Sequence, residues 1–352
     1  MSKYWSAQVA ELKPYVPGEQ PKSQNLIKLN TNENPYGPSP KVLEAIAAHC
    51  DHRLRLYPEP TSLAVREALA EANGLRPEEV FVGNGSDEVL AHVFQGLLKQ
   101  NKPLRFPDIS YSFYPVYCGL FNVASELVPL KQDYRIDVDA MANNEGPVIL
   151  PNPNAPTGIL LSLAEIERLC LMNVDYAVVI DEAYIDFGGE SATTLIAKHP
   201  NLLVVQTFSK SKSLAGMRIG AAYGQAHLIE ALVRVKDSFN SYPLDMLAQA
   251  AAIAATKDQA YYDECNQKVI AARDWLTTEL EALGFNVLPS HANFVFARPP
   301  AGNAEAVQQA LREQSIIVRY FNKPRLNEHL RITIGSQLEC EALVNALKQI
   351  IH

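Results

Sequence analysis

The sequence predicts an α/β protein built on a mostly parallel sheet with helices on both faces. Three observations support this class. Short, nearly continuous apolar runs occur at 147–150, 176–180 and 202–205, and such runs are typical of strands that are buried on both faces. Helical periodicity separates several of these runs, most clearly at 162–171. Polar motifs directly follow the runs, as expected for functional loops at the carboxyl ends of parallel strands.

The N-terminal part of the chain contains an irregular arm and a helical region. The opening thirty residues are rich in Pro, Gln and Lys and show little periodicity, so we expect an extended arm. A strand is expected at 80–82. Helices are expected at 41–50, 61–73 and 89–100.

After about residue 224 the pattern becomes that of an α+β region. Long helices are expected at 227–237 and 244–283, and shorter ones at 304–313 and 340–350. Strands are expected at 286–288, 293–298, 316–319 and 329–334. We therefore predict an arm at 1–30 that joins the smaller domain, a large domain at 31–240 and a small domain at 241–352.

Composition and charge restrict the partners and the compartment. The 352 residues are 47% hydrophobic and 20% charged, which excludes a collagen-like or largely disordered chain. The net charge of -8 and the absence of a basic run argue against nucleic acid. No apolar run has the length of a membrane helix, and no signal core opens the sequence. The five cysteines never occur in CxxC spacing, so we expect free thiols, a cytoplasmic location and no metal site.

The motif GNGSDE, at 83–88, is the first of three polar motifs that follow predicted strands. A strand, a loop with two glycines and a helix start leave free N–H groups beside the positive end of a helix dipole, and this arrangement binds anions. The same residues would also suit a simple helix start, with Ser86 as the cap and Asp87 and Glu88 in the first turn.

The other two motifs carry a carboxylate and an amine. Asp181 ends the apolar run in VVIDEAYIDF, where a buried carboxylate is costly unless a cation meets it. The alternative is an Asp that caps a turn. Lys210 follows 202–205 in QTFSKSKSLAGMRIG, between Ser209 and the more distant Arg218. Partial desolvation makes a lysine amine available to condense with an aldehyde, but a solvated basic turn would have a similar sequence.

Together the three motifs match the requirements of pyridoxal 5′-phosphate. Its aldehyde needs a lysine, and its ring nitrogen needs a carboxylate that keeps it protonated. Its phosphate needs N–H donors, hydroxyl groups and an arginine. The protonated ring can then withdraw electrons from the Cα of a substrate.

These motifs resemble those of a known family. The segments GNGSDE, NPNAPTG, DEAYIDF and SKSLAGMRIG, in this order, are similar to those of fold-type-I pyridoxal-phosphate-dependent aminotransferases. Over nearly the whole chain, further segments resemble the histidinol-phosphate aminotransferases in particular: KPYVPGE, LNTNENPYGPSP, LYPEP, PDISYSFY and IIVRYFNKP…LRITIG. The resemblance implies a large, mostly parallel-sheet domain that carries the cofactor beside a smaller α+β domain.

The resemblance also implies roles around the cofactor. Lys210 would bind the aldehyde and later move a proton at the substrate Cα, and Asp181 would pair with the ring nitrogen. Tyr184 would donate to the phenolic oxygen. Tyr111 would stack on the ring, although a half-buried core tyrosine is the alternative. The phosphate would be held by the segment Gly85, Ser86 and Asp87 together with Ser209 and Arg218.

Tyr57, in LYPEP, resembles the family's tyrosine that reaches the phosphate in the neighbouring subunit, which implies a homodimer with shared sites. One departure concerns the residue before Pro-Thr-Gly. The family pattern has an Asn there that donates to the phenolic oxygen, whereas this chain has Ala155, preceded by Asn154. Either Asn154 reaches the oxygen through a shifted turn, or Tyr184 makes that interaction alone.

Substrate recognition is expected to depend on arginine. One pocket must accept both phosphate and carboxylate groups, and the guanidinium fork suits both. Arg331 in LRITIG resembles the small-domain arginine with this role, and Arg319 is a second candidate, or else a surface residue of an edge strand. Tyr15 and Asn32 are expected to close the pocket from the arm side.

The implied reaction interconverts L-histidinol phosphate and 2-oxoglutarate with imidazole acetol phosphate and L-glutamate, in histidine biosynthesis. Two enzymes remain as alternatives, an aromatic amino-acid aminotransferase of the same subgroup and a threonine-phosphate decarboxylase of the same fold. A non-enzymatic regulator is disfavoured because the two catalytic domains would use the whole chain, which leaves no DNA-binding segment.

Overall fold

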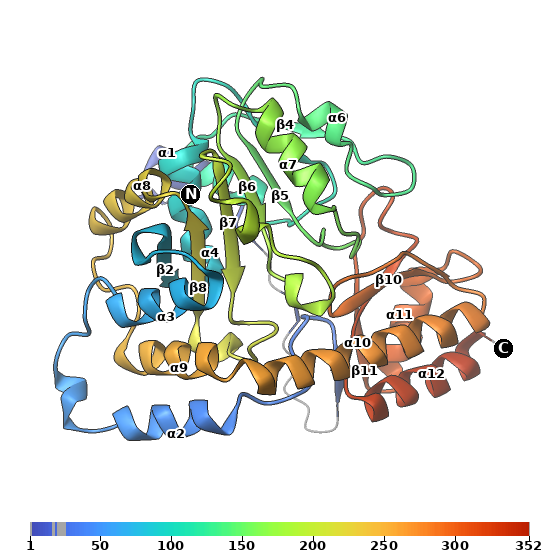
Figure 1. The fold of residues 1–352 in the computed structure, drawn as a ribbon. Coiled ribbons are helices and arrows are strands. Elements are labelled where there is room, and N and C mark those ends of the chain that lie inside the picture. The colour runs from blue at the N-terminus through green and yellow to red at the C-terminus, as the bar shows by residue number, and fades with distance from the viewer. Residues whose placement is uncertain (1, 16–17, 20–25, 352) are drawn as a thin grey trace.

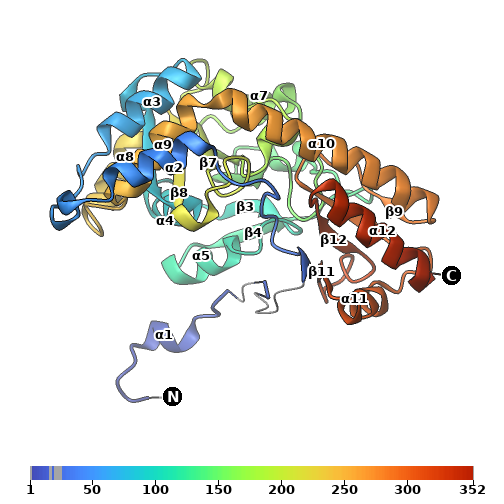
Figure 2. The ribbon, with the colours of Figure 1, turned by 90° about the horizontal axis from the view of Figure 1, so that it is seen from below.

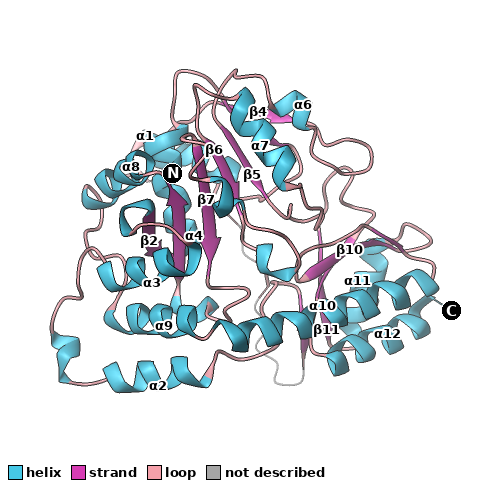
Figure 3. Ribbon diagram, viewed as in Figure 1, coloured by secondary structure: helices cyan, strands magenta, loops and turns pink. Residues whose placement is uncertain are grey.

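A seven-stranded sheet forms the centre of the larger part of the molecule (Figures 1 and 3). The computed structural model describes residues 2–15, 18–19 and 26–351. The strand order is β2-β8-β7-β6-β5-β3-β4, and β8 runs antiparallel to both of its neighbours while the other neighbouring pairs are parallel. The predicted α/β class is therefore confirmed. The strands are β2 (Val80–Asn84), β3 (Leu104–Pro107), β4 (Ser125–Val128), β5 (Val148–Pro151), β6 (Val178–Asp181), β7 (Leu202–Thr207) and β8 (Ile219–Gly224).

Alternate residues of the central strands face two separate cores. In β6, Val178 and Ile180 enter one core and Val179 enters the other. Both faces of the sheet are apolar as a result, which explains the continuous apolar runs in the sequence. The first core is covered by α3 (Leu63–Asn73), α7 (Leu163–Met172) and α9 (Met246–Lys257), and the second by α4 (Gly85–Val93), α5 (Tyr114–Phe121) and α8 (Ala226–Asp237).

A second, five-stranded sheet combines two distant parts of the chain. Its order is β1-β11-β12-β10-β9, in which β1 pairs in parallel with β11 and the other pairs are antiparallel. Three helices pack on this sheet and on one another, at the right of Figure 1. The strands are β1 (Ile27–Leu29), β9 (Asn286–Val287), β10 (Phe294–Arg298), β11 (Ile316–Tyr320) and β12 (Leu330–Thr333), and the helices are α10 (Gln259–Ala282), α11 (Ala304–Glu313) and α12 (Gln337–Ile351).

The prediction of a single helix at 244–283 is wrong, because the helical structure is interrupted at Asp258, between α9 and α10. This residue has φ -106° and ψ 46°, and its carboxylate accepts hydrogen bonds from the Ser39 hydroxyl and the Lys41 ammonium group. The apolar periodicity continues across the break, so the sequence pattern did not reveal it. Because α9 packs on α2 (Pro40–His49) and α3, we propose that the large domain extends to Asp258 rather than to residue 240.

Several other elements differ from the sequence prediction. The helix expected at 89–100 begins earlier, at Gly85, and ends at Val93 before a π-helical turn over Phe94–Leu98. The strands β3, β4 and β8 were not predicted. Strand β8 consists largely of Gly and Ala, which have low strand propensity, so packing against its neighbours decides its conformation.

The N-terminal helix α1 (Ala7–Glu11) lies outside both layers, beside α5 (Figure 2). The side-chain amide of Gln8 donates to the Leu120 carbonyl at 2.6 Å, which joins α1 to the end of α5. Within the described part of the chain, no helix combines the length and the apolar character needed to cross a membrane.

Leu203 provides a test of the buried sheet, since its side chain lies in β7 and is fully buried. We expect Leu203→Ala to lower the free energy of unfolding by about 2–5 kcal/mol, because the truncated side chain leaves a cavity. Urea unfolding followed by circular dichroism measures the change. Leu338→Ala, at an α12 position that is 77% exposed, is the control and should cost less than about 0.5 kcal/mol. Equal effects of the two substitutions would contradict this packing.

Candidate active site

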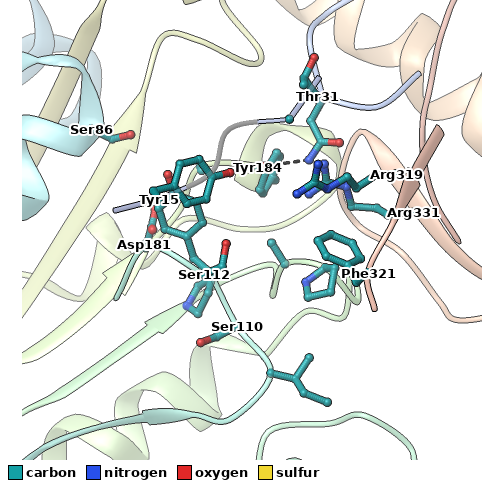
Figure 4. A pocket seen from close by; sticks show the side chains of 18 of the residues that line it. Tyr15, Thr31, Ser86, Ser110, Ser112, Asp181, Tyr184, Arg319, Phe321 and Arg331 are labelled. Carbon is teal, nitrogen blue, oxygen red and sulfur yellow. Dashed lines mark hydrogen bonds between the residues drawn. The ribbon is translucent and has the colours of Figure 1, made fainter. Parts of the chain in front are cut away.

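One cavity of about 800 Å³ lies where the two sheets meet (Figure 4). Pro151, Asp181 and Thr207, the last residues of β5, β6 and β7, line one side. Arg319 of β11 and Arg331 of β12 line the other side. The cavity therefore opens at the carboxyl ends of parallel strands, which is where open α/β sheets bind their ligands.

Asp181 supplies a buried carboxylate that is only partly satisfied. It is 4% exposed, and its Oδ2 accepts a hydrogen bond from the Tyr114 hydroxyl at 2.9 Å. Its Oδ1 is buried without a hydrogen-bond partner among the described residues. Burial raises the pKa of Asp181 to about 7, and the nearby Asp87 adds to the rise, against hydrogen bonds from Tyr114 and the Ala183 backbone. A cationic N–H donor in the cavity would satisfy this oxygen and remove the cost.

Lys210 lies in the loop that follows β7. Its ammonium group donates to the Thr31 carbonyl at 3.1 Å and lies 5.7 Å from the centroid of the Tyr184 ring. The turn before it is held by Thr207, whose hydroxyl oxygen accepts from the Ser209 backbone at 3.2 Å. Lys210 lines the same cavity as Asp181.

The junction where β2 runs directly into α4 forms the third element of the site. Gly85 has φ +79°, and a Cβ atom there would lie 2.5 Å from the guanidinium of Arg218, so only glycine fits. A Cβ at Gly220 would lie 2.4 Å from the Ser86 backbone nitrogen. Arg218 is held by Asp87 at 2.9 Å. The close approach places Arg218 and the start of α4 together at the cavity, which suits an anion.

Two tyrosines line the space between these groups. The Tyr111 hydroxyl donates to Asp87 at 3.0 Å. Burial raises the pKa of Tyr111 well above its usual range, so its hydroxyl group stays protonated and the side chain neutral. Tyr184 packs edge-on against Phe294 with ring centroids 5.1 Å apart. Its hydroxyl oxygen accepts from the Asn32 amide at 2.9 Å (dashed line in Figure 4).

Arg319 and Arg331 form the cationic end of the cavity. They stand directly opposite each other in the β11–β12 register, and Figure 4 shows both side chains pointing into the cavity. The guanidiniums lie 5.3 and 5.6 Å, respectively, from the Phe321 ring. Burial lowers the pKa of Arg331, and the like charge of Arg319 lowers it further. The Nε of Arg331 is buried and has no partner in the part of the chain that the structure describes, so an anion would supply both a counter-charge and a missing acceptor.

The segment after β1 connects the arginine end of the cavity with the lysine end, a role that the sequence analysis largely missed. The Asn30 carbonyl accepts from Arg331 at 2.7 Å, and the next residue, Thr31, holds Lys210. The run of polar residues that follows β1 was the feature of the sequence that could have indicated this role. Tyr15 lines the cavity as expected and packs against Phe113.

Two expected site residues have other partners in the structure. Asn154 is not among the cavity-lining residues, and its amide donates to the Ile109 carbonyl and the Thr157 hydroxyl, both at 3.1 Å. Its remaining oxygen is an acceptor and cannot donate to the phenolic oxygen of a cofactor. Asn32 lines the cavity and is 1% exposed; its NH₂ group donates to Tyr184 and its Oδ1 accepts from Thr333. The expectation that Asn32 closes the pocket over the substrate stays a prediction.

Two further residues lie outside the cavity. Gly85 supports it from behind, through the contact with Arg218. Tyr57 is 81% exposed and stacks on Tyr242 at 4.8 Å, away from the cavity of its own chain. The expectation that Tyr57 serves a neighbouring subunit therefore stays a prediction.

The described residues fit the cofactor expected from the sequence. The unpaired Oδ1 of Asp181 suits a ring N–H, and Lys210 supplies an amine. The hydroxyls of Ser86 and Ser209 and the guanidinium of Arg218 line the same cavity and suit a phosphate.

Comparison with known proteins agrees with this chemistry. The family model for aminotransferase class I and II matches residues 24–347. The chain is 60% identical, over 99% of its length and 98% of the relative, to histidinol-phosphate aminotransferase 2 of Thiobacillus denitrificans. It is 58% identical to the histidinol-phosphate aminotransferase of Aromatoleum aromaticum, with both chains fully covered. The chain belongs to the histidinol-phosphate aminotransferase family.

A solved structure of this aminotransferase family has the same fold. The histidinol-phosphate aminotransferase of Sinorhizobium meliloti, in complex with pyridoxal-5′-phosphate, superimposes with a TM-score of 0.88 at 26% identity. The match covers 100% of this chain and 98% of that chain. The family and the fold-type-I architecture that the motifs implied are therefore confirmed.

The raised pKa of Asp181 predicts a pH-dependent stability of the cofactor-free protein. Between the ordinary value of 3.8 and about 7, the folded protein keeps a proton that the unfolded chain has lost, so stability falls as the pH rises. Asp181→Asn abolishes this titration and keeps an acceptor for Tyr114. We expect its melting temperature to exceed that of the wild type by several degrees above about pH 7, and the gain to shrink toward about pH 4. A difference independent of pH, measured by calorimetry, would contradict the assignment.

Proposed function

We propose that this chain is a pyridoxal-phosphate-dependent aminotransferase of histidine biosynthesis. It would interconvert L-histidinol phosphate and 2-oxoglutarate with imidazole acetol phosphate and L-glutamate. The observation that carries the proposal is the presence, in one cavity, of a buried carboxylate with one oxygen unpartnered among the described residues, a lysine amine and two opposed arginines. The names of relatives at 58% and 60% identity support the choice of substrates.

The residues of the cofactor end would divide the work. Bound pyridoxal phosphate supplies an aldehyde that condenses with amines and a cationic ring that withdraws electrons from the substrate Cα. Asp181 accepts the ring N–H and so retains that proton on the ring, because a buried carboxylate is strongly stabilised by a cationic partner. Lys210 would take the proton from the substrate Cα as general base and would deliver it, as general acid, to the C4′ carbon of the cofactor.

The rest of the cavity would bind the two anionic ends. Ser86, Ser209 and Arg218, together with the start of α4, would hold the cofactor phosphate. Arg331 and Arg319 would bind the substrate anion, which is a phosphate in histidinol phosphate and a carboxylate in 2-oxoglutarate and glutamate. Guanidinium groups bind both anions by donating paired N–H hydrogen bonds, so a single site can serve both halves of the reaction.

Substitution of Lys210 tests the proposed reaction. Purified protein is incubated with histidinol phosphate and 2-oxoglutarate, and glutamate formation is measured. We expect Lys210→Ala and Lys210→Arg both to lose turnover, since arginine keeps the charge but cannot condense with the aldehyde. Hydride reduction of the wild type should attach the cofactor to the peptide that contains Lys210. Native turnover by either variant would contradict the mechanism.

The choice of donor separates the alternatives. Phenylalanine as the better amino donor would indicate an aromatic amino-acid aminotransferase. Release of carbon dioxide from threonine phosphate would indicate a decarboxylase. The proposal expects glutamate from histidinol phosphate at the highest kcat/KM and no carbon dioxide from threonine phosphate.

We further propose a homodimer in which Tyr57 of one subunit completes the phosphate site of the other. The exposed Tyr57–Tyr242 pair supports this assignment, because two stacked aromatic rings in solvent leave apolar surface for a partner. All five cysteines are free, which is typical of the reducing cytoplasm, where we propose that the enzyme works.

Mixed dimers test the role of Tyr57. Tyr57→Ala homodimers should bind the cofactor about tenfold more weakly, because one phosphate hydrogen bond is lost. Mixing them with Lys210→Ala subunits should create one intact site per mixed dimer and recover turnover. If Tyr57 acted within its own chain, mixing would recover nothing.

A further inference from the structure

Three consecutive residues after β1 each contact a different functional group of the cavity. The Asn30 carbonyl accepts from Arg331 at 2.7 Å, and the Thr31 carbonyl accepts from Lys210 at 3.1 Å. The Asn32 side-chain amide donates to the Tyr184 hydroxyl at 2.9 Å. Asn32 is the one of the three that acts through its side chain, so its orientation determines which atom faces Tyr184.

The orientation of the Asn32 amide is set by two buried neighbours. The hydroxyl oxygen of Thr333 accepts the Asn32 backbone N–H at 3.0 Å, and the Thr333 hydroxyl donates to Asn32 Oδ1 at 2.9 Å. Asn293 donates to the Asn32 carbonyl at 3.0 Å and holds the backbone at φ +56°. All three residues are at most 2% exposed, so water does not compete for these hydrogen bonds.

This network fixes which way the Asn32 amide points. A hydroxyl has a single hydrogen, and in Thr333 that hydrogen goes to the oxygen of the Asn32 amide. The NH₂ side must therefore face Tyr184. In the reversed orientation, the Thr333 hydroxyl would lose the acceptor that it has in the structure, Asn32 Oδ1, and would face a second donor instead.

The amide orientation decides what the Tyr184 hydroxyl can do. Because Tyr184 receives a hydrogen from Asn32, its oxygen is an acceptor there and its own hydrogen is not used. In the described part of the chain, the one hydrogen bond found for the Tyr184 hydroxyl is the one that it accepts from Asn32, and Tyr184 lines the cavity. With the opposite amide orientation, Tyr184 would have to donate to Asn32 Oδ1, and the cavity would lose a donor.

We propose that Asn32 is a positioning residue that keeps the Tyr184 hydroxyl hydrogen available to the phenolic oxygen of the cofactor, and that Thr333 holds Asn32 in this orientation. The inference rests on the proposed function, which supplies the cofactor. It gives β12, the strand that carries the anion-binding Arg331, a second role through its last residue, Thr333.

The test is a pH titration of the bound cofactor. Wild type, Thr333→Val and Thr333→Ser are loaded with pyridoxal phosphate, and the absorbance of the lysine-bound cofactor is followed. A hydrogen bond donated to the phenolic oxygen stabilises the negative charge of that oxygen. Without it, the charge helps to retain a proton on the nitrogen that links Lys210 to the cofactor. Loss of the donor should therefore raise the midpoint of Thr333→Val by about half to one pH unit. Thr333→Ser keeps the hydroxyl and should keep the wild-type midpoint.

A double variant separates positioning from a general structural effect. Tyr184→Phe lacks the donor entirely and should raise the midpoint at least as much as Thr333→Val. In the Tyr184→Phe background, Thr333→Val should add no further shift, because both changes act through the same hydroxyl. Additive shifts would overturn the proposal, and so would a shift in Thr333→Ser equal to that in Thr333→Val.

A further variant keeps the proposal testable if Thr333→Val folds poorly. Asn32→Ala removes the donor to Tyr184 while leaving β12 unchanged, and it should also raise the midpoint. An Asn32→Ala midpoint equal to that of the wild type would overturn the proposal. Failure of the proposed function is distinguishable, since it would appear as absent glutamate formation from histidinol phosphate, whereas this titration depends only on cofactor binding and would show no pH-dependent absorbance in the wild type if the cofactor did not bind.

Discussion

The buried carboxylate of Asp181 is the constraint on which the site depends. It lies at the end of the otherwise apolar strand β6, where Tyr114 satisfies one oxygen and no described residue partners the other. Such a group costs stability unless a cation arrives. The surrounding structure provides the space for that cation and, in the loop that follows the next strand along the chain, the Lys210 amine. Folding stability is sacrificed here in a way that only ligand binding can offset.

The opposite end of the cavity has the reverse electrostatic problem. Arg319 and Arg331 face each other across two paired strands of the smaller sheet, and the buried Nε of Arg331 has no acceptor among residues 2–15, 18–19 and 26–351. A cation-binding carboxylate at one end and an anion-binding arginine pair at the other suit a molecule that is positive at one end and negative at the other. The segment at residues 30–32 joins both ends, so neither end can move without affecting hydrogen bonds to the other.

The departure at Ala155 increases the importance of this connection. An alanine side chain donates no hydrogen bond, and Asn154 is turned toward Ile109 and Thr157. Tyr184 is then the hydroxyl donor whose orientation the protein controls, and that control is exerted from the arm and from β12 through Asn32 and Thr333. In this chain, a change in the smaller domain can thus reach the cofactor through hydrogen bonds rather than through direct contact.

The sequence by itself determined the α/β class, the family and the positions of Asp181, Lys210 and Arg218, because apolar strand patterns and the polar residues that end them are local features. It did not determine the antiparallel strand β8, the helix break at Asp258, the turned amide of Asn154 or the role of Asn32. Each of these depends on partners far away in the chain, such as Ser39 for Asp258 or Thr333 for Asn32. Only tertiary structure decided them, since a buried polar group takes the conformation that satisfies its hydrogen bonds, whatever its local sequence prefers.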